Sequence, residues 1–224
     1  MAAEDEQFIR EVEEEYRRDR IAQFWRRYST LIVAALLLLL VGVGGWRYWQ
    51  HSQAQTAQAA AVRFYEASEL AEQGKHDEAR AAFESLAADA PGGYALLTRF
   101  RLAAELGRTD AEGGATAYDA LAADGNINPV WQDLARLRAS MLRFDNADPA
   151  KIRTDLERLA GPEQIWRHTA RELLGLSGLK ARDYEFASQW FDRIAADRET
   201  PAGLRQRLEI YTALVAGGPV TSTQ

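Results

Sequence analysis

The feature that constrains the fold most is a short segment that returns along the C-terminal two-thirds of the chain. Residues 83–89 read Phe-Glu-Ser-Leu-Ala-Ala-Asp, and related segments occur at 118–124 and 191–197, with a weaker copy at 156–161. The central aliphatic residues of the four copies are 35, 38 and 35 residues apart. A period of this length indicates repeated supersecondary units that bury their apolar faces against one another.

Prolines indicate where a new helix starts after each copy. One follows each of the four segments, at Pro91, Pro129, Pro162 and Pro201. Proline is tolerated at the start of a helix, where its missing N–H would have no partner in any case. Each copy therefore predicts the end of one helix, a short turn and the start of the next.

The spacing within the units is that of the tetratricopeptide pattern, Ala-x3-Phe followed eight residues later by Pro. Ala79, Phe83 and Pro91 match it, and Gly74 lies at the expected turn. The last unit matches with Leu174-Gly175, Tyr184, Ala187 and Phe191. The second unit departs from the pattern, with Gly114 where Ala is expected, and the third keeps little of it.

These patterns predict an all-α chain in which a single transmembrane helix precedes a TPR-like α-solenoid of about four hairpins plus a closing helix. No segment alternates as a strand would. Helices are expected at 53–73, 76–89, 91–106, 111–123, 129–144, 149–160, 162–180, 184–197 and 201–216. The residues after 217 are expected to be frayed.

The membrane prediction rests on an apolar run near the N-terminus. No charged residue occurs from Tyr28 to Trp46, and 31–43 is almost wholly aliphatic. As a helix the run spans roughly 28 Å, close to the thickness of a bilayer's hydrocarbon core. Aromatic residues flank it on both sides, as is typical of membrane interfaces. We expect a transmembrane helix at 28–49.

The flanking charges predict the orientation of this helix. Five arginines precede it closely and only Arg47 follows it, so the N-terminus is expected to be cytoplasmic and the C-terminal domain periplasmic. A cleaved signal peptide is the alternative. The apolar run begins after about thirty residues that include eight acids, unlike a short basic n-region, so an uncleaved anchor is favoured.

The first 27 residues form a predicted cytoplasmic charged arm. Phe8, Val12 and Tyr16 recur at helical spacing, and Glu13 and Glu14 precede arginines by four residues. Either a solvated helix whose arginines meet anionic headgroups or a docking helix for a partner fits this pattern.

The export-side domain is predicted to cover 50–217, followed by a frayed tail at 218–224. Residues 50–61 contain neither Gly nor Pro. Their composition favours a helix that continues the membrane span as a semi-rigid stalk, with a flexible tether as the alternative.

Composition argues against several kinds of chemistry. The chain has no cysteine, three widely separated histidines and a net charge of −6, so thiolate chemistry, a zinc site and nucleic-acid binding are not expected. No nucleophile–base pair, carboxylate dyad or phosphate-binding loop stands out. We expect no enzyme activity, cofactor or metal. For Trp131, Trp166 and Trp190, packing between hairpins is favoured over a ligand site.

A helical-hairpin array offers a groove for a helix or an extended segment of another protein. Repeat register places five possible groove contacts on the first helices of the units, although a surface or packing role is equally compatible with each. They are Phe64, Thr98, Gln132, Arg136 and Glu172.

The chain as a whole resembles the bacterial ancillary SecYEG translocon subunit family, particularly its short alphaproteobacterial members. The resemblance rests on the architecture and on the segments 10–14, 92–94 and 170–174. It implies an inner-membrane protein whose periplasmic TPR domain associates with the translocon, a periplasmic chaperone and exported polypeptides. The family supplies no catalytic residues.

Two other functions remain open. One is a structural scaffold for another envelope complex, such as the division, wall-synthesis or secretion machinery. The other, weaker one is cytoplasmic signalling through the arm.

Overall fold

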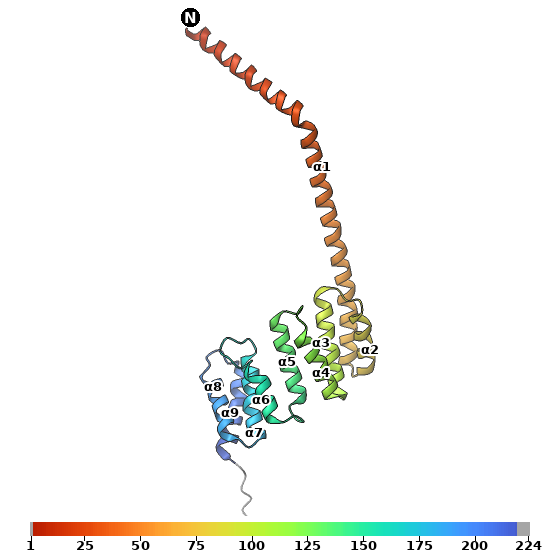
Figure 1. The fold of residues 1–224 in the computed structure, drawn as a ribbon, viewed down its shortest axis with the longest axis vertical. Coiled ribbons are helices and arrows are strands. Elements are labelled where there is room, and N and C mark those ends of the chain that lie inside the picture. The colour runs from red at the N-terminus through yellow and green to blue at the C-terminus, as the bar shows by residue number, and fades with distance from the viewer. Residues whose placement is uncertain (1, 219–224) are drawn as a thin grey trace, which may run out of the picture. The chain divides into compact units, whose positions relative to one another are not determined.

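A computed structural model describes the backbone of residues 2–218 and the side chains of residues 25–218 except 32, 35 and 36. The chain divides into two compact units, Met1–Gln58 and Ala59–Gln224. Every regular element in the described residues is an α-helix, which confirms the predicted all-α class. Figure 1 labels the helices, which are α1 (Ala2–Glu72), α2 (His76–Ala87), α3 (Gly92–Thr109), α4 (Ala111–Ala123), α5 (Pro129–Arg143), α6 (Pro149–Glu157), α7 (Arg167–Lys180), α8 (Tyr184–Ala196) and α9 (Ala202–Gly217).

The first unit consists of α1 up to Gln58. Aliphatic side chains described in this unit are exposed, and Leu37–Val41 are between 57% and 74% exposed. Among the described residues, no helix is both long and apolar enough to cross a membrane. The side chains of residues 32, 35 and 36 in the predicted span are not among those described, and neither are those of the predicted stripe at Phe8, Val12 and Tyr16. The tail from 219 onward lies outside the described residues.

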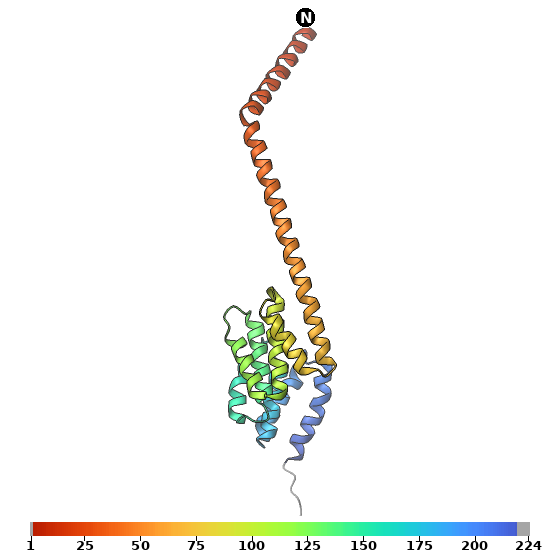
Figure 2. The same cartoon turned by 90° about the vertical axis from the view of Figure 1, so that its right-hand side faces the viewer.

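The second unit is a succession of antiparallel hairpins. The end of α1 pairs with α2, and the following pairs are α3 with α4, α5 with α6, and α7 with α8, with α9 closing the array. From α2 onward, helices that are neighbours in sequence pack against each other, a succession that can be followed by colour in Figure 2. This nearest-neighbour packing is what repeat architectures require.

Capping residues fix where several of these helices begin. Asn128 and Asp148 each precede a proline, and their side chains accept hydrogen bonds from the backbone N–H of Val130 and Ala150 at 3.0 Å. An Asn or Asp cap followed by Pro at the first helical position satisfies the free backbone groups of a helix start. These pairs account for the starts of α5 and α6.

The predicted start of the helix at 162–180 was wrong by five residues. Residues 161–166 form turns, and α7 begins at Arg167. Trp166 holds this connection in place, because its indole Nε1–H donates to the carbonyl of Val130 at 3.0 Å. Pro162 therefore lies in the crossing from α6 to α7 and does not open a helix.

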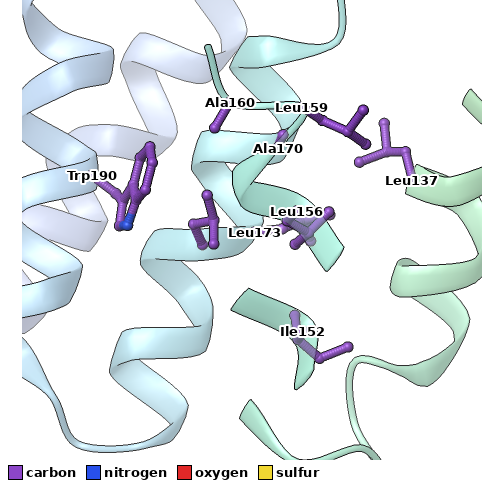
Figure 3. Close-up of a cluster of buried hydrophobic side chains, with 9 residues drawn as sticks. Leu137, Ile152, Leu156, Leu159, Ala160, Ala170, Leu173 and Trp190 are labelled. Atoms are coloured by element: carbon purple, nitrogen blue, oxygen red, sulfur yellow. The ribbon is translucent and has the colours of Figure 1, made fainter. Parts of the chain in front are cut away.

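The core is a chain of small clusters. The largest described one joins α5, α6, α7 and α8, and Figure 3 shows its side chains converging. Its buried members are Leu137, Ile152, Leu156, Leu159, Ala160, Ala170, Leu173, Leu174 and Trp190. The aromatic residues of the repeated segment, Phe83, Tyr118 and Phe191, are at most 4% exposed. They fill the space inside their own hairpins, as the repeat pattern predicts.

Gly114 has a packing reason for departing from the pattern. A Cβ atom at this position would lie 2.4 Å from Cα of Gly107, on the facing helix. The two backbones approach too closely for alanine, so the second hairpin closes on a glycine pair.

Candidate functional site

The hairpins are closed by a repeated ion pair. In each hairpin a cation and an acid 25 or 26 residues apart join the first helix to the end of the second. The pairs are Arg63–Asp89 at 2.9 Å, Arg99–Asp124 at 2.8 Å, Asp133–Arg158 at 3.2 Å and Arg171–Asp197 at 2.8 Å. The aspartates of the three matching sequence segments thus share one role, and the third hairpin reverses the two charges.

Asp197 has the densest set of partners. Its carboxylate also accepts from Arg167 at 3.0 Å, and its other oxygen accepts the backbone N–H of Glu199. The Arg167 guanidinium, ahead of the other donors, lowers the pKa of this carboxyl to about 2. Burial lowers the pKa of the adjacent His168, whose Nδ1 lies 3.9 Å from Asp197. This cluster links α7 to the end of α8.

Two grooves open between successive second helices of the hairpins, each floored by the first helix between them. The first groove runs between α2 and α4 over α3 and has a volume of about 310 Å³. Its walls are mostly aliphatic, and three charged residues stand among them. The lining consists of Arg80, Glu84, Arg99, Leu102, Ala103, Leu106, Ala117, Ala120 and Leu121.

The second groove, about 420 Å³, runs between α4 and α6 over α5 and is polar. Arg143 dominates it, with hydrogen bonds to Glu112 at 2.6–3.0 Å and to Asp119 at 2.7 Å. The contact with Arg143 lowers the pKa of Glu112. Lys151 pairs with Asp155 at 2.8 Å. Because Arg143 and Lys151 have acidic side chains at hydrogen-bond distance, their positive charges are already balanced by acids of the same chain.

Of the five predicted contacts, only Arg136 lines one of these two grooves. It lies in the second groove, where Nη2 donates to the carbonyl of Ala122 and Nη1 to Asp133. Gln132 donates from Nε2 to the carbonyls of Asp124 and Ile127 and so holds the turn before α5.

The other three predicted residues serve packing. Phe64 lies against Phe83, with ring centroids 5.6 Å apart. Thr98 is fully buried, and Glu172 binds Arg207 and Tyr211 of α9 at 2.7–2.9 Å. Their role as partner contacts stays a prediction.

Sequence reasoning missed the grooves because it looked only at the first helices. The first groove is lined as much by Ala117 and Ala120, on α4, as by Leu102 and Leu106, on α3. A signal was present, since small residues at exposed positions of a second helix leave space beside the aliphatic residues of its neighbour. Within the described residues, no three His or acidic side chains gather as a metal site.

Comparison with known protein families matches residues 22–175 to the tetratricopeptide repeat-like domain. The match ends within α7, the first helix of the last hairpin. No curated protein and no solved structure matches the chain.

Proposed function

Since the chain belongs to the tetratricopeptide repeat-like family, whose helical arrays bind other proteins, we propose that it is a membrane-anchored scaffold on the export side of the bacterial inner membrane. In this proposal it associates with the Sec translocon and with periplasmic chaperones, and it assists exported polypeptides. The family match supports binding of proteins in general. The anchor, the compartment and the partners are the proposed part.

The observation that carries the proposal is the exposed aliphatic surface of α1. Leu31, Val33, Leu37–Val41 and Val43 are all more than half exposed. Leaving such side chains in water costs about 1.5–3 kcal/mol each relative to burial. No described side chain of the first unit covers them, so a lipid environment best accounts for an exposed run of this length.

The charges around this run support the proposed orientation. Arg26 and Arg27 stand immediately before it, and the rest of the arm adds four more arginines. Basic residues next to a span stay on the cytoplasmic side. The repeat array then faces the export side.

The repeat array supports binding in preference to chemistry. Its ionic groups are used between helices, as at Asp197 and Arg143, and its first groove is apolar. The resemblance of the whole chain to the ancillary translocon subunit family names the partners to test.

Site-specific photocrosslinking tests the proposal. Benzoylphenylalanine would be placed in the full chain in cells at Ala120, which is exposed on the first groove, and at Gln206, which is exposed on α9. We expect Ala120 adducts that contain translocon subunits, periplasmic chaperones or exported chains, and fewer from Gln206. Adducts with none of these three classes would contradict the proposal.

Cell imaging distinguishes the alternative scaffold function. If the chain associates with the translocon, a fluorescent fusion of this chain should give a uniform signal around the cell periphery. A septal or polar signal would instead favour a division or wall-synthesis complex.

A further inference from the structure

The apolar groove between α2 and α4 is open at a position where its counterpart later in the array is filled by a tryptophan. We propose that this groove accepts an aromatic side chain from an extended segment of a partner polypeptide. The inference rests on the proposed function and adds to it the chemistry by which exported chains would be recognised.

The register of the repeats identifies the counterpart. Leu159 follows Leu86 by 73 residues, and Ile194 follows Leu121 by the same number. The trio α2, α3 and α4 therefore corresponds to α6, α7 and α8. On this register Arg80 corresponds to Arg153 and Ala117 to Trp190.

The floor of the groove follows the same correspondence. Leu173 of α7 follows Leu102 of α3 by 71 residues. The difference of two arises because three residues separate α7 from α8, whereas only Asp110 separates α3 from α4. The pair Leu102 and Ala117 thus matches the pair Leu173 and Trp190.

In the counterpart, the space is occupied from within. Trp190 is 8% exposed and packs in one cluster with Leu156 and Leu173. Figure 3 shows its ring lying beside Leu173. Phe186, one turn earlier on α8, lies with its ring centroid 6.1 Å from that of Trp190. The protein's own side chains show which chemistry completes a groove of this shape.

Arginines cover both rings of the filled counterpart. The Cζ atom of Arg193 lies 4.3 Å from the centroid of Trp190, and that of Arg153 lies 3.8 Å from the centroid of Phe186. A guanidinium over an aromatic face is attracted by the negative potential of the ring.

The open groove keeps one of these two arginines without the ring, because Arg80 corresponds to Arg153, whereas the counterpart of Arg193 is Ala120. Alanine stands at position 117, and the floor presents Leu102 and Leu106. Arg80, the counterpart of Arg153, and Arg99 stand on the lining with side chains 43% and 41% exposed. An aliphatic floor below exposed guanidinium groups complements an aromatic ring in both apolar surface and charge distribution. The volume of about 310 Å³ is at the small end of the range for ligand pockets, which suits one side chain better than a folded surface.

The second groove lacks this complementarity. At the position of Ala117 and Trp190 it has Asp155, which pairs with Lys151, and its floor carries Arg143. Burying a ring there would require the desolvation of paired charges. The first groove also carries paired arginines, Arg80 with Glu84 and Arg99 with Asp124. Its floor presents Leu102 and Leu106, so a ring bound there would contact aliphatic side chains, which favours the first groove.

Fluorine NMR on a short peptide tests the inference. The probe is Gly-Ser-fluorotryptophan-Ser-Gly with blocked ends, titrated with the full chain in detergent micelles. We expect its signal to broaden and shift with the wild-type chain. Ala117→Trp, which fills the groove as Trp190 fills its counterpart, should weaken binding at least tenfold. Ala213→Trp, at an exposed position of α9, is the matched control and should bind as the wild type does.

A second variant protects the test against misfolding. Leu102→Gln puts an amide on the groove floor and should also weaken binding, with helicity by circular dichroism kept as a check on both variants. Undiminished binding by folded Ala117→Trp or Leu102→Gln, or no binding by the wild type, would overturn the inference. Translocon adducts obtained without peptide binding would remove this inference alone, whereas loss of both would remove the proposed function as well.

Discussion

At the scale of single residues, Thr98 shows that the repeat spacing predicts which helix carries a residue but not which side of that helix is buried. Sequence spacing placed it on the first helix of the second unit, and it is there, on α3. Which side of that helix is covered depends on how closely the neighbouring hairpins approach, and the sequence does not state this distance. The side chain is fully buried, and its hydroxyl has no hydrogen-bond partner among the described residues.

Replacing this hydroxyl should stabilise the protein. An unsatisfied buried polar group costs about 1–3 kcal/mol, and valine has nearly the same shape as threonine. Thr98→Val should raise Tm by about 2–12 °C, given about 2–4 °C per kcal/mol for a chain of this size. Thermal unfolding of the full chain in micelles, followed by circular dichroism, measures the change. Thr116→Val, at an exposed position of α4, should leave Tm unchanged. A lower Tm for Thr98→Val would mean that the hydroxyl is satisfied.

Asp197 predicts a specific dependence of stability on acid. Its pKa in the folded chain, about 2, lies below the value of about 3.9 for an unfolded aspartate. Its stabilising contribution is therefore complete above about pH 4 and is lost as the pH falls toward 2. Arg167, Arg171, His168 and Glu199 face the carboxylate or its partners.

The matching variant is Asp197→Asn, which should lower Tm at neutral pH and flatten the decline of Tm between about pH 4 and pH 2.5. Asp192→Asn, at an exposed position of α8, is the control and should retain the wild-type decline. Parallel acid curves for all three proteins would show that Asp197 is not a major source of the pH dependence.

At the scale of elements, the sequence predicted the hairpins well and their connections less well. The helix predicted at 111–123 agrees with α4 at both ends, because Asp110 caps its start and Asp124 lies just beyond its last turn. The error at Pro162 arose because the path of 161–166 is set by a contact between Trp166 and Val130, 36 residues apart. Local propensity carries no information about such a contact. The grooves were missed for the same reason, since they depend on the spacing between hairpins.

The closing helix α9 gives a direct comparison between covered and uncovered positions. Leu204 and Leu208 pack on Phe191 and Ile194, whereas Leu214 is 55% exposed. Leu208→Ala should destabilise the array by about 2–4 kcal/mol, the usual cost of truncating a buried leucine. Leu214→Ala should change stability by less than about 0.5 kcal/mol. Urea unfolding of the full chain in micelles compares the two variants, and equal effects would contradict the assignment of α9 as a cap.

At the scale of the whole molecule, two units with different surfaces make up the chain. One exposes an aliphatic helix surface, and the other buries its aliphatic residues between hairpins and exposes charged residues. The proposed function requires the aliphatic run of the first unit to lie in the bilayer and the second unit to face the export side.

Cysteine accessibility tests this claim most directly, because the chain has no cysteine of its own. Single variants Ala3→Cys, in the arm, and Thr116→Cys, on the exposed side of α4, would be treated in intact spheroplasts with a membrane-impermeant maleimide. We expect the chain to be recovered in the membrane fraction, with Thr116→Cys labelled and Ala3→Cys labelled only after lysis. A chain recovered in the soluble fraction, or labelling of Ala3→Cys while Thr116→Cys is protected, would contradict it.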